Sequence, residues 1–230
     1  MAPPTIAETK VLIVDDHPFM RRGLAQTIKD QPGLTVCGEA GTIAAALELI
    51  ESMKPHVAVV DISLGGESGI ELIEILRKTK PEVRVLVSSM HDESLFAERA
   101  IRAGALGYVN KGEPPTVFID ALLRVRAGET YLSERIAKRL LADRRNDESD
   151  PMRSPITKLS NRELEVYDLI GRGKATRQIA AQLGVSKKTV EAHREHIKQK
   201  LNLSNATQLT QSAVQYVLEQ GRPIDGDTFM

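Results

Sequence analysis

The sequence predicts two domains of different class: an α/β domain with a doubly wound, five-stranded parallel sheet, and an all-α domain of four helices. Three observations predict this division. Apolar runs alternate with amphipathic stretches in the first half, a polar segment with two prolines follows, and helical periodicity fills the rest. We expect the α/β domain at residues 1–127, a linker with a short helix at 128–156, the helical domain at 157–221 and a frayed tail at 222–230.

Five short runs rich in β-branched residues are the expected strands. They occupy residues 11–14, 34–37, 57–60, 83–87 and 106–109. They are uninterrupted apolar runs, which is typical of strands covered on both faces. The stretches between them space their apolar residues at i, i+3 and i+4, as a helix with one buried face does. The clearest of these stretches are residues 43–50, 70–76, 96–103 and 116–125. Such alternation predicts a parallel sheet between two layers of helices.

The second half contains four expected helices. Ser160-Asn-Arg-Glu163 is a capping-box sequence that opens a helix reaching about residue 170. Gly184 suits the end of a second helix and Ser186 the cap of a third. The second and fourth expected helices cover residues 176–183 and 205–219.

The expected linker has two parts. Residues 133–143 predict a short helix. Residues 144–155 are polar and charged and carry two prolines, so they cannot bury enough apolar surface to order themselves. We therefore expect this second part to be flexible.

The composition excludes several classes of protein. With 41% hydrophobic and 27% charged residues, the chain is typical of a soluble globular protein. No apolar run is long enough for a membrane span, and the N-terminus lacks the basic and apolar regions of a signal peptide. Cys37 is the only cysteine, which excludes an internal disulfide and a cysteine-rich zinc site. We expect a cytoplasmic protein that does not contact a membrane.

The net charge of zero is unevenly distributed. Residues 1–127 carry 14 Lys and Arg against 17 Asp and Glu, whereas residues 156–222 carry 11 against 6. Neutralisation of phosphates by basic residues drives nucleic-acid binding. The basic second half is therefore the candidate for binding DNA.

Polar residues follow four of the five expected strands. The first strand ends in Asp15-Asp16, the third in Asp61 and the fourth in Ser88-Ser89, and the fifth leads to Lys111. The carboxyl ends of parallel strands form one ligand-binding rim. Clustered carboxylates repel one another and need a cation, for which Mg²⁺ with a phosphoryl group is the best candidate. The lysine would neutralise phosphoryl oxygens.

Residues 10–125 strongly resemble the receiver domain of response regulators, which has a flavodoxin-like strand order. Asp61, Ser89 and Lys111 are 28 and 22 residues apart, which suits the strand–helix repeats of this fold. The residues that carry the resemblance are Asp15-Asp16-His17-Pro18, Asp61, Ser89, Tyr108 and Lys111.

The resemblance implies a phosphorylation switch. Asp61 would accept a phosphoryl group from a histidine kinase and release it by slow self-catalysed hydrolysis, and beyond this the protein would not be an enzyme. The Mg²⁺ ligands would be Asp15, acting through water, with Asp16, Asp61 and the backbone carbonyl of Ser63. The residues that respond to phosphorylation would be Ser89, Tyr108 and Lys111. Such a local change of charge biases a bistable element.

The loop after Asp61 departs from the family pattern. Met-Pro is usual there, and here the chain has Leu64-Gly65-Gly66. Glycine in place of proline is expected to loosen the backbone. A phosphorylation-independent DNA-binding regulator with a degenerate receiver is therefore the alternative function. A phosphohydrolase with Asp61 as nucleophile would require a second acid two residues later, where Ser63 stands.

The third expected helix of the second half has the arrangement of a DNA-reading helix. Val190, Ile197 and Leu201 share one face, which must pack against the domain. The opposite face and its flanks are free for the major groove and its phosphates. The candidate DNA-binding residues are Ser186, Lys187, Lys188, Thr189, Glu191, Ala192, Glu195, Lys198 and Lys200.

Residues 159–216 closely resemble the LuxR-type helix-turn-helix, so that the whole chain resembles the NarL/FixJ family of transcriptional regulators. The resemblance rests most on Glu163, Ile179-Ala180, Thr189-Val190 and Lys200-Leu201. It implies that Glu191, Ala192 and Glu195 face base edges, where a glutamate can accept from a cytosine amino group. His193 lies on the packing side, which favours a structural role over base reading.

Phosphorylation is expected to act through a shift of population. The unphosphorylated receiver would cover the DNA-binding surface or keep the protein monomeric, and phosphorylated Asp61 would favour a homodimer on double-stranded DNA with two-fold symmetry. The helix at residues 205–219 is the expected dimer contact. Its expected exposed pairing residues are Leu209, Ala213, Tyr216 and Val217.

Overall fold

The structure is a computed structural model that describes residues 8–91, 93–134, 136–138 and 155–219. The chain divides into two compact units, Met1–Arg145 and Asn146–Met230. We call them the N-terminal and the C-terminal unit and describe each by itself. Most of the expected flexible linker, residues 144–154, and the expected tail, residues 222–230, lie outside the described residues.

The N-terminal unit contains the expected five-stranded sheet. All its strands are parallel, in the order β2-β1-β3-β6-β7. The five strands are β1 (Thr9–Val14), β2 (Leu34–Ala40), β3 (Val57–Val60), β6 (Arg84–Ser89) and β7 (Gly107–Asn110). The chain crosses from one side of β1 to the other between β2 and β3, which places a ligand-binding crevice at the carboxyl ends of β1 and β3. The predicted doubly wound fold is confirmed.

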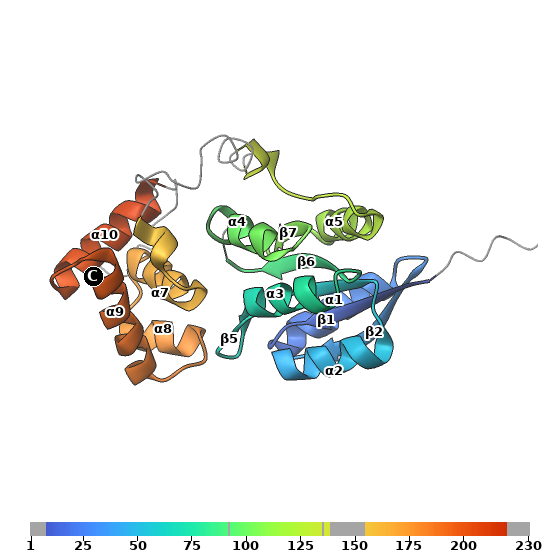
Figure 1. Ribbon diagram of the computed structural model, residues 1–230, viewed down its shortest axis with the longest axis horizontal. Coiled ribbons are helices and arrows are strands. Elements are labelled where there is room, and N and C mark those ends of the chain that lie inside the picture. The colour runs from blue at the N-terminus through green and yellow to red at the C-terminus, as the bar shows by residue number, and fades with distance from the viewer. Residues whose placement is uncertain (1–7, 92, 135, 139–154, 220–230) are drawn as a thin grey trace, which may run out of the picture. The chain divides into compact units, whose positions relative to one another are not determined.

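Helices cover both faces of this sheet (Figure 1). They are α1 (Pro18–Lys29), α2 (Ile43–Met53), α3 (Gly69–Thr79), α4 (Glu93–Ala103) and α5 (Pro115–Ala127). Val11 and Ile13 of β1 belong to a core that also contains Ile28 of α1 and Phe118 of α5. The intervening Leu12 is equally buried. Because consecutive strand residues point to opposite faces, the sheet has two cores, as its uninterrupted apolar runs predict.

A short antiparallel hairpin follows Asp61 and was not expected from the sequence. It consists of β4 (Ser63–Leu64) and β5 (Glu67–Ser68). Gly65 and Gly66 form its two-residue turn with φ values of +58° and +109°. Positive φ at both central positions is what a tight hairpin turn demands, and glycine adopts it at little cost. The two glycines therefore form a specific hairpin turn, and the looser backbone expected of them stays a prediction.

The C-terminal unit consists of helices, as predicted. Its elements are η1 (Pro155–Lys158), α7 (Asn161–Gly171), α8 (Thr176–Gln182), α9 (Lys187–Leu201) and α10 (Ala206–Glu219). The predicted capping box is present at the start of α7. The Ser160 hydroxyl accepts from the backbone N–H of Glu163 at 3.3 Å, and the Glu163 carboxylate accepts from that of Ser160 at 2.7 Å.

The expected exposure of α10 is wrong. Leu209, Ala213 and Val217 are fully buried, and Tyr216 is half-buried with its ring 5.6 Å from that of Tyr167 on α7. These apolar residues pack against α7 because a small domain needs its fourth helix to close the core. Leu218 is the exposed apolar residue of α10, with 55% of its surface accessible.

Candidate functional site

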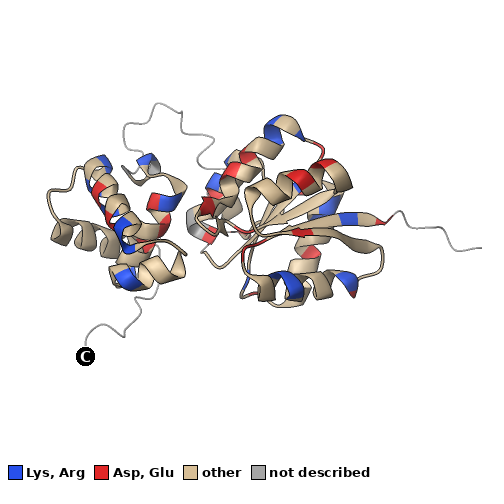
Figure 2. Cartoon of the chain, turned by 90° about the horizontal axis from the view of Figure 1, so that it is seen from below, with Lys and Arg blue, Asp and Glu red and all other residues tan. Residues whose placement is uncertain are grey.

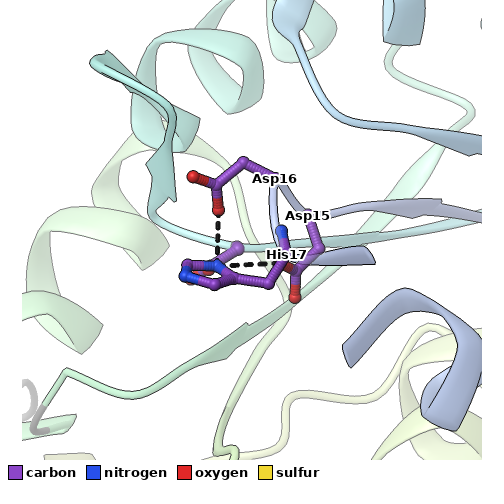
Figure 3. A group of neighbouring side chains, drawn as sticks. Asp15, Asp16 and His17 are labelled. Carbon is purple, nitrogen blue, oxygen red and sulfur yellow. Dashed lines mark hydrogen bonds and ion pairs between the residues drawn. The ribbon is translucent and has the colours of Figure 1, made fainter. Parts of the chain in front are cut away.

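Three carboxylates meet at the crevice between β1 and β3. Asp15 and Asp16 follow β1, Asp61 follows β3, and together with His17 they offer ligand atoms that all lie within 4.8 Å of one another. Asp15 and Asp61 are buried, Asp16 is half-buried and His17 is exposed. The His17 Nδ1 lies 2.7 Å from Asp16 Oδ1 and 3.5 Å from Asp15 Oδ1 (Figure 3). The structure therefore brings together the carboxylates that the strand ends predicted, and adds His17 to them.

The Lys111 ammonium bridges two of these carboxylates from the end of β7. Its Nζ lies 2.5 Å from Asp61 Oδ2 and 2.6 Å from Asp15 Oδ2. The side chain of Lys111 is only 1% exposed, so the contacts are shielded from water. Three carboxylates against one ammonium leave an excess of negative charge in the crevice. A divalent cation would remove that excess.

The ionisation of the pair reflects its burial. Burial raises the pKa of Asp61 above its ordinary value, and the nearby Lys111 charge opposes this shift without cancelling it. Burial acts to lower the pKa of Lys111, but the charges and hydrogen bonds of Asp61 and Asp15 outweigh it and raise that pKa. A raised pKa keeps Lys111 protonated at neutral pH, and a further positive neighbour would favour the ionised form of Asp61.

The hairpin after Asp61 is fastened to the acidic cluster. The backbone N–H of Gly65 donates to Asp16 Oδ2 at 2.9 Å. Glu67 on β5 accepts from the backbone N–H of Ile43 at the start of α2 at 3.0 Å. Gly69 begins α3 with its backbone against that of Asp61, where an added Cβ would lie 1.9 Å from the Asp61 carbonyl oxygen. The chain around Asp61 is thus held by specific contacts on both sides.

The expected switch residues lie at the ends of β6 and β7. Ser89 is fully buried and its hydroxyl accepts from the backbone N–H of His91 at 3.3 Å. Tyr108 is also buried, and its hydroxyl donates to the carbonyl of His91 at 2.8 Å. The His91 ring lies 2.9 Å from the hydroxyl of Ser63. His91 therefore links three of the expected site residues. It was not predicted because it lies two residues beyond the end of β6, outside the strand-end positions.

In the C-terminal unit, α8 and α9 are joined by the predicted turn. Gly184 has a φ of +64°, and the Ser186 hydroxyl caps α9 by accepting from the backbone N–H of Thr189 at 3.0 Å. Val190 and Ile197 are fully buried. The face of α9 expected to pack is thus packed, and its opposite face is left to solvent.

The charged residues of α9 fall into two groups. Lys187, Lys188 and Glu191 near its start are exposed, as is Ala192. Towards its end Lys198 pairs with Glu195 at 2.9 Å, and Lys200 donates to Glu163 at 2.6 Å. Figure 2 shows that basic and acidic residues are interspersed over the helices of this unit. The start of α9 therefore offers two exposed basic residues, Lys187 and Lys188, to a phosphate backbone.

His193 is half-buried on α9. Burial lowers its pKa, and the nearby Arg162 charge lowers it further. A neutral, half-buried imidazole suits the packing role expected for it.

Each of the two units matches a known protein family. The receiver domain of response regulators matches residues 11–123, and the luxR family of bacterial regulatory proteins matches residues 157–213. The response regulator GacA of Pseudomonas aeruginosa is 32% identical over 207 residues, which are 90% of this chain and 96% of that protein. The chain belongs to the response regulators. It is a two-component response regulator that controls transcription.

Other response regulators resemble this one at similar levels. UvrY of Escherichia coli is 30% identical over 208 residues, covering 90% of this chain and 94% of UvrY. A LuxR-family response regulator from Aurantimonas sp. SI85-9A1 has a solved structure that is 34% identical, with a TM-score of 0.55 over 60% of this chain and 99% of that one. RcsB of Salmonella enterica serovar Typhimurium, at 23% identity and a TM-score of 0.58, covers 90% of this chain and 98% of its own and shows the shared fold.

A helix that spans a bilayer needs about 20 predominantly apolar residues. Among the described residues, none forms a helix of sufficient length and apolar character to cross a membrane.

Proposed function

We propose that Asp61 is the phosphoacceptor of this response regulator and that a histidine kinase is its phosphodonor. The observation that carries the proposal is the buried contact of Lys111 with Asp61 and Asp15. A carboxylate oxygen of Asp61 would form a bond to phosphorus while the phosphorus–nitrogen bond of the donor phosphohistidine breaks, and the imidazole leaves and takes up a proton. Lys111 would then pair with a phosphoryl oxygen.

The residues of the crevice fit Mg²⁺. The donors are oxygen atoms, which this hard cation prefers. Asp61 Oδ1 is buried, and no residue of the described part of the chain meets it in hydrogen-bond geometry, while the Ser89 hydroxyl lies near enough to the carboxylate to favour its ionised form. A buried acceptor in this position can take a metal ion as its partner. The proposed ligands are Asp15 through water, Asp16, Asp61 and the backbone carbonyl of Ser63. When bound, Mg²⁺ would neutralise charge on the transferred phosphoryl group.

Ser89 and Tyr108 are the proposed responding residues. Both already meet at His91, through its backbone N–H and carbonyl. The Ser89 oxygen accepts from the His91 N–H, and a phosphoryl group on Asp61 would offer the hydrogen of the same hydroxyl a charged acceptor. Movement of Ser89 would therefore change the contact between Tyr108 and His91. Slow self-catalysed hydrolysis of the aspartyl phosphate by water would end the signal.

The phosphorylation step is tested by the mass of the intact protein. The full chain is incubated with acetyl phosphate and Mg²⁺, beside Asp61→Asn as the matched variant. A phosphoryl adduct on the wild type alone is the expected result. An unmodified wild type with an intact fold would contradict the proposal and favour the degenerate receiver.

The C-terminal unit is proposed to bind double-stranded DNA with α9 in the major groove. RcsB shares the fold, and its structure is of a complex with the promoter rprA. In this chain the start of α9 presents Lys187 and Lys188 to solvent. The remaining candidates for phosphate or base contact are Ser186, Thr189, Glu191, Ala192, Glu195, Lys198 and Lys200. Phosphate contacts would provide affinity, and base edges would provide sequence preference.

The salt dependence of binding tests the placement of α9. Each lost phosphate contact lowers the slope of log affinity against log salt by about 1. We expect this change for Lys187→Ala. Lys200→Ala is the comparison variant. Because Lys200 already donates to Glu163, its removal is expected to change the slope less than Lys187→Ala does and to lower the free energy of unfolding. Equal slopes for Lys187→Ala and the wild type would contradict the placement.

A homodimer in the cytoplasm completes the proposal. The dimer would form on phosphorylation or DNA binding and match two half-sites. The exposed side of α10, which includes Leu218, is the proposed contact in place of the buried residues first expected. Sedimentation of the phosphorylated protein on DNA should show a weaker dimer for Leu218→Ser. Unchanged dimerisation would place the contact elsewhere.

A further inference from the structure

Glu191 differs from the other acidic residue on the exposed face of α9. Its Oε1 accepts a hydrogen bond from the Thr176 hydroxyl at 2.8 Å. Thr176 is the first residue of α8, so this contact joins the two helices of the helix-turn-helix. Glu195, by contrast, pairs with Lys198 one turn along α9 itself. Only Glu191 of these two acids is therefore oriented by a neighbouring helix.

A second contact restricts the same carboxylate. The Arg194 Nε lies 3.8 Å from Glu191 Oε2, and the Arg194 side chain is only 17% exposed. The Glu191 side chain remains 56% exposed. One oxygen is thus fixed by a hydroxyl and the other lies near a guanidinium, while the group as a whole is accessible to a ligand. An exposed glutamate without such contacts would sample many rotamers and lose that freedom on binding.

We propose that Thr176 is a specificity-determining residue, which holds the Glu191 carboxylate so that it accepts a hydrogen bond from a cytosine amino group in the major groove. This inference rests on the proposed function, because it requires α9 to enter that groove. An ionised carboxylate only accepts hydrogen bonds. In the major groove cytosine presents a donor alone, whereas adenine adds an acceptor at N7, and guanine and thymine present acceptors.

The same charge that selects cytosine lowers general affinity for DNA, because it lies near phosphates. Glu191 is therefore better suited to rejecting wrong bases than to strengthening binding. The Thr176 hydroxyl adds to this discrimination by fixing where the carboxylate stands. Oxygen lone pairs remain for the base, since the threonine occupies only one of about four acceptor positions of a carboxylate.

The test is selection of binding sites from a random double-stranded DNA library by the full-length phosphorylated protein. The wild type should select a fixed cytosine in each half-site, preferred over other bases about tenfold or more. Thr176→Val keeps the shape and removes the hydroxyl, and should reduce that preference roughly three- to tenfold at this position alone. Thr176→Ser keeps the hydroxyl and is the matched control, with the preference retained.

Glu191→Gln is the second variant and does not depend on Thr176. Glutamine pairs with adenine through the N–H and the carbonyl oxygen of its side-chain amide, so the selected base should change from cytosine to adenine. Thermal unfolding of each variant should match the wild type, since Glu191 is exposed and Thr176 half-buried. Unchanged selection by Glu191→Gln, or by Thr176→Val, would overturn the inference while leaving DNA binding intact. Failure of the wild type to enrich any sequence would overturn the proposed function and the inference with it.

Discussion

The acidic crevice and the start of α9 are both rich in charge, but their environments differ. In the crevice, the side chains of Asp15, Asp61 and Lys111 are between 1% and 5% exposed. On α9, Glu191 and Glu195 are 56% and 61% exposed. Buried charges interact strongly and cost much to leave unpaired, whereas exposed charges are screened by water and salt. The crevice is therefore suited to a switch, and the face of α9 to exchanging water for DNA.

The largest difference in stability between the two regions is expected when one lysine ammonium is removed from each. Lys111→Met leaves Asp15 and Asp61 buried without a cation and should destabilise the N-terminal unit by about 3 kcal/mol. Lys198→Met removes the half-buried partner of the exposed Glu195 and should cost less than about 1 kcal/mol. Urea denaturation in metal-free buffer measures both.

Mg²⁺ provides the control for this experiment. It should restore part of the stability lost by Lys111→Met, because it supplies another cation to the same carboxylates. It should leave Lys198→Met unchanged. Equal losses for the two variants would show that burial does not distinguish these charges.

The C-terminal unit also has a buried carboxylate, that of Glu163. It is 4% exposed. Burial acts to raise its pKa, but the hydrogen bond from Lys200 and those involving Ser160 outweigh burial, so the pKa is lowered below its ordinary value of 4.5. Glu163→Gln should cost about 1–2 kcal/mol at pH 7.

The pH dependence of that difference follows from the lowered pKa. Because the folded state binds the proton less readily than the unfolded state, ionised Glu163 stabilises the fold fully above pH 4.5. The contribution is lost as the pH falls from there through the folded pKa. The difference between wild type and Glu163→Gln, measured by denaturation at several pH values, should therefore shrink in acid. A difference independent of pH would assign the loss to packing.

The sequence predicted most of the fold because the uninterrupted apolar runs of the strands and the helical periodicity of the other stretches were both clear. The apolar runs that became β1, β3, β6 and β7 each end next to a polar residue of the crevice, and strand order alone brings these residues together. The hairpin after Asp61 was missed because strands of two residues have no periodicity. From sequence alone the Gly-Gly pair indicates a loose backbone, whereas it forms the two-residue turn of the hairpin.

Exposure was predicted less well than secondary structure. The apolar residues of α10 were assigned to a partner, but the sequence does not say whether a helix buries its apolar face within its own domain or against another chain. The ion pairs of α9 were also missed. Lys198 and Lys200 looked like phosphate contacts, and their partners Glu195 and Glu163 lie three and 37 residues away.

The hairpin turn provides a test of intermediate size at the edge of the crevice. Gly65→Ala forces a residue with a Cβ to a φ of +58° and should destabilise the N-terminal unit by about 1 kcal/mol. Gly23→Ala is the matched control, since Gly23 lies within α1 with open space around its missing Cβ. It should stabilise by about 0.5–1 kcal/mol. Thermal denaturation gives both signs, and a neutral Gly65→Ala would mean that the turn is not held in this conformation.

The smallest expected effect is the coupling between Glu195 and Lys198. Both ends of this pair are on α9, three residues apart, and the glutamate is 61% exposed. A double-mutant cycle on stability should give about 0.3–0.5 kcal/mol, falling towards zero in 1 M salt. Arg162 and Glu165 have the same spacing on α7, but Glu165 is 1% exposed. Their coupling should be several times larger and should resist salt, because water is excluded from the pair. Equal couplings at the two sites would mean that spacing along a helix, rather than burial, sets the coupling energy of these ion pairs. Burial would then not explain the difference between the acidic crevice and the exposed face of α9.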